Sequence, residues 1–226
     1  MPVVLVFSSF SFAMEMNFEV KSAINFKNFC ERNGLGYEDV KIPRKIFENN
    51  QIDHLVNNAG IGILESFLDV TEDAWDKIYQ INLKAAVFIS QMFAKAYQKR
   101  FENKEKNFGT IVNISSQASV ACLDQHLVYC SCKAALDMAG RMMAKELSGP
   151  FNIRINNINP TVVLTALGKM AWSDPKKAGP MKSKIPLDRF AEVDEVVRPV
   201  MFLLSKESSM VNASNMYIDG GFVNTN

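Results

Sequence analysis

The sequence predicts an α/β protein with a Rossmann-like, doubly wound parallel sheet, and two observations support this fold class. From about residue 50 onward, short apolar runs alternate with longer helical patterns, as in a parallel sheet that helices cover on both faces. Polar turn motifs also follow directly on three of the predicted strands, at 57–60, 115–116 and 159–161. Because ligands bind outside the carboxyl ends of such strands, we expect a functional site there.

The predicted strands are apolar runs that end at turn residues, and they lie at 3–6, 52–56, 109–115, 153–158 and 215–219. Thr71 is expected to cap a helical stretch that runs, with a break, to about residue 106. A segment rich in Ala, Met, Leu and Lys predicts a helix at 129–147, and another is expected at 192–205. The segment between 160 and 192 has a looser pattern.

The length of 226 residues predicts a single domain over 1–226, with an atypical start at 1–50. A formal net charge of +1 gives no electrostatic case for nucleic acid or for an anionic membrane. The 4 cysteines and 2 histidines show no metal-ligand spacing, and free thiols fit a cytoplasmic protein. The apolar run at 2–14 lacks the basic start of a signal peptide and is too short to span a membrane.

Tyr129 and Lys133 are four residues apart, and this spacing places them on one face of the predicted helix. A nearby ammonium favours the phenolate form of a tyrosine. The pair could therefore exchange a proton with a carbonyl or alcohol oxygen. The alternative is an amphipathic helix with a surface lysine, since the same spacing is common on helices.

Three further motifs could carry function. Ser116 follows a predicted strand and could hold a substrate oxygen beside the phenol, or could be a turn serine. Asn82 lies inside the long helical stretch, where asparagine is a mediocre helix former, so it could bend the helix and hold a water near Lys133, or could be an ordinary polar position. The turn at 57–60 could bring backbone close to a ligand, or could be a plain turn.

The order and spacing of these motifs resemble the classical short-chain dehydrogenase/reductase family, over about residues 50 to 226. Asn57–Gly60 matches the family's N-N-A-G turn, Asn82 its catalytic Asn and Ser116 its catalytic Ser. Tyr129 with Lys133 matches the family's Y-x-x-x-K pair. Asn159–Pro160 matches its N-P-G turn, with Thr161 in place of the glycine.

The resemblance implies an NADP(H)-dependent oxidoreductase with Asn82, Ser116, Tyr129 and Lys133 as catalytic residues. Tyr129 would be the proton donor, Ser116 would orient the substrate oxygen, and Asn82 would support a proton-relay water. Lys133 would hold the nicotinamide ribose and favour ionisation of Tyr129. The cofactor contacts that the resemblance implies are Asn57, Ala59, Gly60, Tyr129, Lys133, Pro160, Val162, Val163 and Thr165.

The segments at 128–138, 159–163, 172–175 and 185–193 are similar to a branch of the family that reduces L-xylulose to xylitol and also reduces small α-dicarbonyls. This similarity implies a pocket for a small carbonyl or sugar substrate. Its expected residues are Ser116, Gln117, His126 and Trp172. Apart from this resemblance, His126 could be a solvated loop residue and Trp172 a packing aromatic.

A homo-oligomer, most simply a tetramer, is also implied, because the family pairs its long helices. The helices expected at 82–100 and 129–147 are apolar over much of their surface, which needs a partner or a thick core. Their large apolar residues include Phe88, Ile89, Met92, Met138, Met142 and Met143.

The N-terminus departs from the family. The family's first strand leads into a T-G-x-x-x-G-x-G loop, whose glycines let backbone amides approach a pyrophosphate. Here the segment 7–12 contains no glycine, Gly34 and Gly36 come too late, and a second strand is not recognisable. The choice of NADP over NAD therefore rests on the resemblance alone.

Three explanations of this departure stay open: a gene model or splice form of a working reductase, a natural variant with weak cofactor binding, or a non-catalytic oligomer subunit or binding protein.

Overall fold

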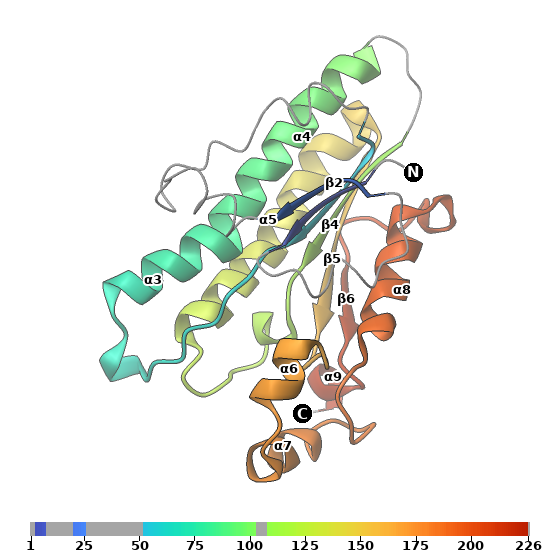
Figure 1. The fold of residues 1–226 in the computed structure, drawn as a ribbon. Helices are drawn as coiled ribbons and strands as arrows, with labels where there is room; N and C mark the ends of the chain where they lie inside the picture. Colours follow the sequence, from blue (N-terminus) through green and yellow to red (C-terminus); the bar gives the residue numbers. More distant parts are fainter. Residues whose placement is uncertain (1–2, 8–19, 26–51, 103–107, 226) are drawn as a thin grey trace.

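The computed structural model describes residues 3–7, 20–25, 52–102 and 108–225. They form a parallel sheet with helices on both faces, which confirms the predicted fold class (Figure 1). The strand order is β2-β1-β3-β4-β5-β6. The strands are β1 Val3–Phe7, β2 Val20–Asn25, β3 His54–Asn58, β4 Gly109–Ile114, β5 Ile153–Pro160 and β6 Asn215–Ile218.

Two strands differ from the sequence prediction. A second strand, not recognisable from the pattern, lies at Val20–Asn25 and pairs in parallel with β1. Its run Val-Lys-Ser-Ala-Ile-Asn has polar residues at three of its positions, so neither a continuous apolar run nor strict alternation marks it. Strand β5 continues through Asn159 and Pro160, because Pro160 still pairs with Ile218 of β6.

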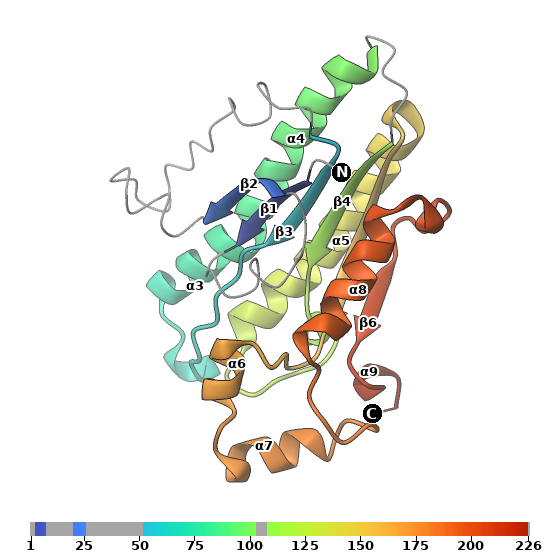
Figure 2. The ribbon, with the colours of Figure 1, turned by 45° about the vertical axis from the view of Figure 1, so that its right-hand side comes forward.

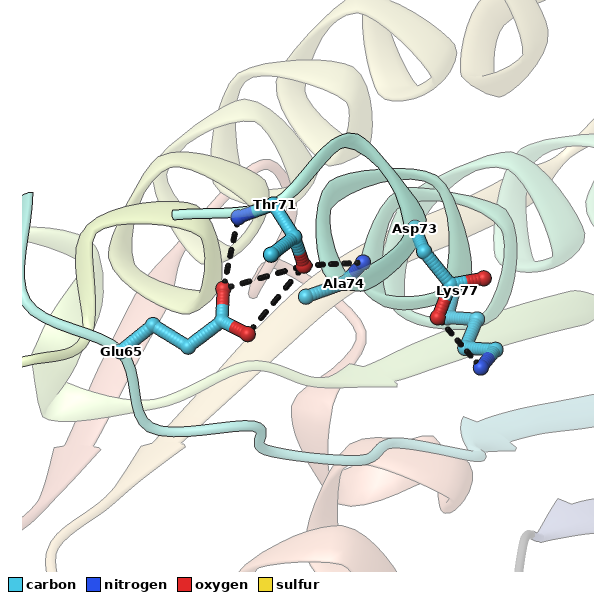
Figure 3. Close-up of polar contacts among 5 residues, drawn as sticks. All are labelled: Glu65, Thr71, Asp73, Ala74 and Lys77. Atoms are coloured by element: carbon cyan, nitrogen blue, oxygen red, sulfur yellow. Dashed lines mark hydrogen bonds and ion pairs between the residues drawn. The ribbon is translucent and has the colours of Figure 1, made fainter. Parts of the chain in front are cut away.

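The long helical stretch begins at α3 Glu72–Tyr79, continues through a π-helical turn at Gln80–Lys84 and becomes α4 Ala85–Glu102. The π-turn is the predicted break, and it contains Asn82. Thr71 caps α3 as predicted, since its Oγ1 accepts the Ala74 amide at 3.2 Å (Figure 3). The carboxylate of Glu65 accepts the Thr71 amide at 2.9 Å, which ties the preceding loop to the same helix end.

Alternate residues of the central strands bury opposite faces of the sheet. Leu55, Ile111 and Ile155 pack with the core that α4 and α5 Leu127–Phe151 cover. Val56, Val112 and Ile158 pack under α8 Val193–Leu204 on the other face (Figure 2). This alternation with both faces apolar is typical of a parallel sheet between two helical layers.

The segment expected to be looser contains two short helices beyond the carboxyl ends of the strands (Figures 1 and 2). They are α6 Ala166–Ala171 and α7 Pro175–Lys182, and each begins at a capping side chain, Thr165 or Asp174. In the sequence, these two helices are therefore marked by the capping residues at their starts and not by an apolar periodicity. The remaining short helices are η1 Phe67–Asp69, η3 Gln117–Ser119, η4 Lys206–Ser208 and α9 Phe222–Thr225.

Among the described helices, none combines the length and the hydrophobicity that crossing a membrane would require.

Candidate active site

The motifs from the turn after β3, the π-turn and α5 meet at one point of the sheet's carboxyl edge. A Cβ placed on Gly60 would lie 3.6 Å from Asn82 Oδ1 and 3.7 Å from Lys133 Nζ. These are ordinary van der Waals distances, so the glycine sits against both side chains without a steric demand for glycine. The structure therefore brings together three residues that are far apart in the sequence.

Asn82 fastens the chain after β3 to the π-turn. Its side chain is 1% exposed, and its Nδ2 donates to the Ile61 carbonyl at 2.8 Å. The Ile61 amide in turn donates to Asn82 Oδ1 at 2.8 Å. This reciprocal pair of hydrogen bonds joins the loop after β3 to the π-turn. Single π-turns of this kind occur frequently at functional sites.

Lys133 is buried in α5, with 4% of its surface exposed. Its Nζ donates to the Ile114 carbonyl at 2.8 Å and lies 5.6 Å from the centroid of the Tyr129 ring. Burial lowers the pKa of Lys133 to about 8, against the opposing effects of Asp137 and Cys132. The ammonium can therefore lose its proton within a mildly alkaline range.

Ser116 and Tyr129 are also brought together. Burial raises the pKa of Tyr129, and a hydrogen bond with the Ser116 side chain acts in the opposite direction. Burial is the larger of these effects, so the phenolate form that the sequence led us to expect is disfavoured in this structure. A neutral phenol beside a serine hydroxyl can donate a proton to an oxygen held between them.

Two of the residues proposed to contact the cofactor at the end of β3, Asn57 and Ala59, direct their side chains into the protein, so only their backbone is available to a ligand. Asn57 donates through Nδ2 to Ser90 Oγ at 2.9 Å and to Asn113 Oδ1 at 2.8 Å, so its side chain joins β3 to α4 and β4. Ala59 packs against the core beneath α4. The backbone of this turn is what it can offer to a ligand, together with the surface at Gly60.

The segment after Pro160, the last residue of β5, is held at the same edge. Val163 forms a parallel bridge with Ala191, and the side chain of Val162 packs in the apolar cluster around α7. Thr165 uses its hydroxyl to cap α6. The buried Thr161 Oγ1, by contrast, has no hydrogen-bond partner among the described residues.

The residues expected to bind substrate are only partly brought together. His126 precedes α5, and its ring meets the Tyr129 ring edge-on at a centroid distance of 6.0 Å. Gln117 follows Ser116 and is buried, and its Oε1 lacks a partner in the described part of the chain. Trp172 packs edge-on against Phe190 at 5.2 Å, the arrangement expected of a packing aromatic.

Sequence reasoning missed Asp137 and the side chain of Asn159. Asp137 is 2% exposed, and its Oδ2 accepts a hydrogen bond from Asn159 Nδ2 at 2.9 Å. The available signal was its position four residues after Lys133, on the same face of the helix. The segment 8–12, where the glycine-rich loop is missing, lies outside the described residues, as do Gly34 and Gly36.

A family model described as enoyl-(acyl carrier protein) reductase matches residues 44–223. L-xylulose reductase of Mus musculus is 49% identical over 174 residues, which span 77% of this chain and 69% of that protein. Carbonyl reductase [NADPH] 2 of Sus scrofa is 39% identical over 172 residues, covering 76% of this chain and 68% of that protein.

Solved structures share the fold. A gluconate 5-dehydrogenase from Burkholderia cenocepacia, in complex with NADP and tartrate, aligns with a TM-score of 0.81. The alignment covers 100% of this chain and 96% of that one, at 22% identity. At this level of identity the likeness concerns the fold.

Proposed function

The chain belongs to the short-chain dehydrogenase/reductase family of oxidoreductases, which act on CH–OH and C=O groups, and we propose that it is an NADPH-dependent reductase of small carbonyl compounds. Its proposed substrates are L-xylulose, reduced to xylitol, and small α-dicarbonyls. The observation that carries this proposal is the meeting of Asn82, Ser116, Tyr129 and Lys133 at the carboxyl edge of the sheet.

We propose a division of roles among these four side chains. Tyr129 donates its phenolic proton to the substrate oxygen, and Ser116 orients that oxygen by a hydrogen bond. Lys133 holds its charge beside the phenol, where it stabilises the phenolate that remains after proton transfer. Asn82 keeps the loop after β3 in place through Ile61 and so maintains the path for a relay water.

A nicotinamide cofactor supplies the hydride in this chemistry, and the described residues fit one. The candidate contacts are the backbone of Asn57–Gly60, the side chains of Tyr129 and Lys133, and the segment from Pro160 to Thr165. The buried Thr161 Oγ1 without a partner, at the edge of this region, is a polar atom that a ligand could satisfy. The preference for NADP over NAD is taken from the name of the porcine relative.

The proposed substrate pocket is built around Gln117 and His126, which lie between Ser116 and Tyr129 along the chain. The buried Gln117 Oε1 offers an unpaired acceptor to a substrate hydroxyl. Trp172 would close the apolar side of the pocket through the cluster that it shares with Phe190 and Ala121. Small polyhydroxy ketones and α-dicarbonyls fit a site of this polar kind better than steroids or fatty acyl chains.

A comparison of reduction rates tests the proposed function. L-xylulose and diacetyl should be reduced with NADPH faster than a steroid ketone at equal concentration. Faster turnover of the steroid would contradict the substrate assignment, and normal turnover by Tyr129→Phe would contradict the mechanism.

A second candidate function, that of a non-catalytic subunit or binding protein, is favoured by the glycine-free segment at 7–12. Losing two charge-assisted hydrogen bonds to the pyrophosphate, each worth roughly 1.5–3 kcal/mol, would weaken NADPH binding by about two to four decades. Calorimetric titration of the chain with NADPH separates the two functions. No detectable binding would favour the second, whereas micromolar binding would show that another segment replaces the loop.

We also propose a homo-oligomer, most simply a tetramer. Of the apolar residues that suggested it, Phe88, Met138 and Met142 are exposed on α4 and α5, while Ile89 is buried in the core. The exposed three lie on neighbouring helices, where a second copy could cover them. Light scattering at micromolar concentration tests this, and a monomer would contradict it.

A further inference from the structure

The buried carboxylate of Asp137 needs an explanation, because a charge removed from water is costly unless it is paired and hydrogen-bonded. Its Oδ2 accepts two hydrogen bonds at 2.9 Å, from Asn159 Nδ2 and from Asn215 Nδ2. Its Oδ1 has no partner among the described residues, and no ion pair to Asp137 occurs within that same part of the chain. Packing alone would be served better by an apolar residue.

We propose that Asp137 is a positioning residue of the active site, which anchors the turn carrying Ser116 through Asn159 and faces Lys133 with a compensating negative charge. The inference rests on the proposed function, because it assigns Asp137 a task in that reaction. Asp137 acts through other side chains and is not itself expected to touch substrate or cofactor.

Asp137 anchors the turn that carries Ser116 through a chain of hydrogen bonds, the anchoring route, which runs from α5 across the end of β5. Asn159 Nδ2, held by Asp137, lies 3.1 Å from the Ser116 carbonyl and 3.0 Å from Ser119 Oγ. Ser116 precedes the short helix η3 and Ser119 is its last residue, and Ser116 Oγ accepts the Ala118 amide at 3.1 Å inside the same turn. One buried amide, oriented by one carboxylate, therefore contacts both ends of the turn that carries Ser116.

The second effect, the charge route, is the direct electrostatic interaction of Asp137 with Lys133. The two residues are four positions apart and face the same side of α5. Within the described residues, the titratable groups that these contacts place around Lys133 come from its own helix: Tyr129, Cys132 and Asp137. The neighbouring elements present neutral groups, namely the Ile114 carbonyl of β4 and the carboxamide of Asn82 in the π-turn. Asp137 is the one carboxylate among the groups that these contacts identify.

Asp137→Asn tests the charge route, because the amide has the same shape and can still accept hydrogen bonds. Loss of a unit charge about 6 Å away in this buried site should lower the pKa of Lys133 by about one to two units. NMR titration of the Lys133 Nζ in the cofactor-free chain measures the shift from its starting value of about 8. An unchanged pKa would overturn this part of the proposal.

Asn159→Ala tests the anchoring route and keeps the charge of Asp137. Hydrogen exchange of the Ala118 amide should become at least about tenfold faster, while the Lys133 pKa stays the same. Asn215→Ser is the matched control, because it removes the other hydrogen bond to the same carboxylate oxygen at the end distant from Ser116.

If Asn215→Ser accelerates Ala118 exchange as much as Asn159→Ala does, Asp137 has only a structural role and the proposal fails. Both readouts use the cofactor-free chain, so they decide the role of Asp137 separately from whether the chain reduces a carbonyl. Where turnover is measurable, Asp137→Asn should lower kcat most strongly on the alkaline side of the pH profile, and Asn159→Ala should lower it evenly. Equal kcat profiles for wild type and Asp137→Asn would also contradict the proposal.

Discussion

Acidification from pH 8 to pH 4 is expected to destabilise the fold through His54, a residue far from the active site. His54 begins β3 and is 2% exposed, and its Nδ1 lies 2.8 Å from Thr110 Oγ1 on β4. Burial, aided by the positive charge of Arg154, lowers the pKa of His54 from 6.5 to about 4. The native state therefore keeps this imidazole neutral where an unfolded chain would protonate it.

The sign and size follow from proton linkage. Because the pKa is lowered in the native state, the unfolded state binds more protons between pH 6.5 and about 4, and stability falls as the pH falls through this window. At 1.36 kcal/mol per pKa unit, His54 alone should remove about 2 kcal/mol by pH 5 and about 3 kcal/mol by pH 4. Almost none of this loss should be present at pH 7.

Urea unfolding of wild type and His54→Asn at pH 8, 7, 6, 5 and 4 measures this effect. The asparagine can replace Nδ1 as a partner of Thr110 but does not titrate in this range. Carboxylates and His126 are common to both proteins, so they cancel in the difference between the two unfolding free energies. If that difference is constant from pH 8 to pH 4, His54 is not buried as a neutral base and the reasoning is wrong.

Three other changes have expected outcomes. Tyr129→Phe should lower kcat by roughly 10²–10⁴-fold in a steady-state assay, because the variant keeps the ring but loses the proton donor, and turnover at the wild-type rate would contradict this role. Gly140→Ala should cost about 1–3 kcal/mol in urea unfolding, because its Cβ would lie 2.8 Å from Asn157 Nδ2 inside a buried amide network. Gly149→Ala, on the same helix with nothing within 4 Å, is the control and should be neutral or stabilising. A family-type glycine-rich loop grafted at 7–12 should increase NADPH affinity and reductase rate over the unmodified chain, and no gain would show that the loop is not what limits binding.

Most of the central fold could be predicted from local patterns. The strands at 52–56, 109–115 and 215–219 are marked by apolar runs that end at turn residues, and Thr71 is marked as a cap by its place before a helical pattern. Strand β2 could not be predicted, since its polar residues interrupt the apolar run and its pairing with β1 is non-local. The helices α6 and α7 escaped prediction because their capping residues, not their periodicity, mark them.

The candidate site shows the same division. Residue types and spacing made Asn82, Ser116, Tyr129 and Lys133 candidates, and the resemblance of their motifs to a known family favoured them over the purely structural alternatives. Charges and partners were not predictable, because burial and contacts between different elements of the fold determine them. Thus burial raises the Tyr129 pKa against the expected effect of Lys133, and Asp137 reaches Ser116 through Asn159 only because β5 passes beside α5.

By itself, therefore, the sequence determined the α/β class and most of the central strands, because these depend on short-range periodicity and turn chemistry, and it marked candidate site residues through motifs that resemble a known family. Only the tertiary structure decided which side chains meet, which lose water and which pKa values move, because desolvation and hydrogen bonding are set by neighbours from other elements.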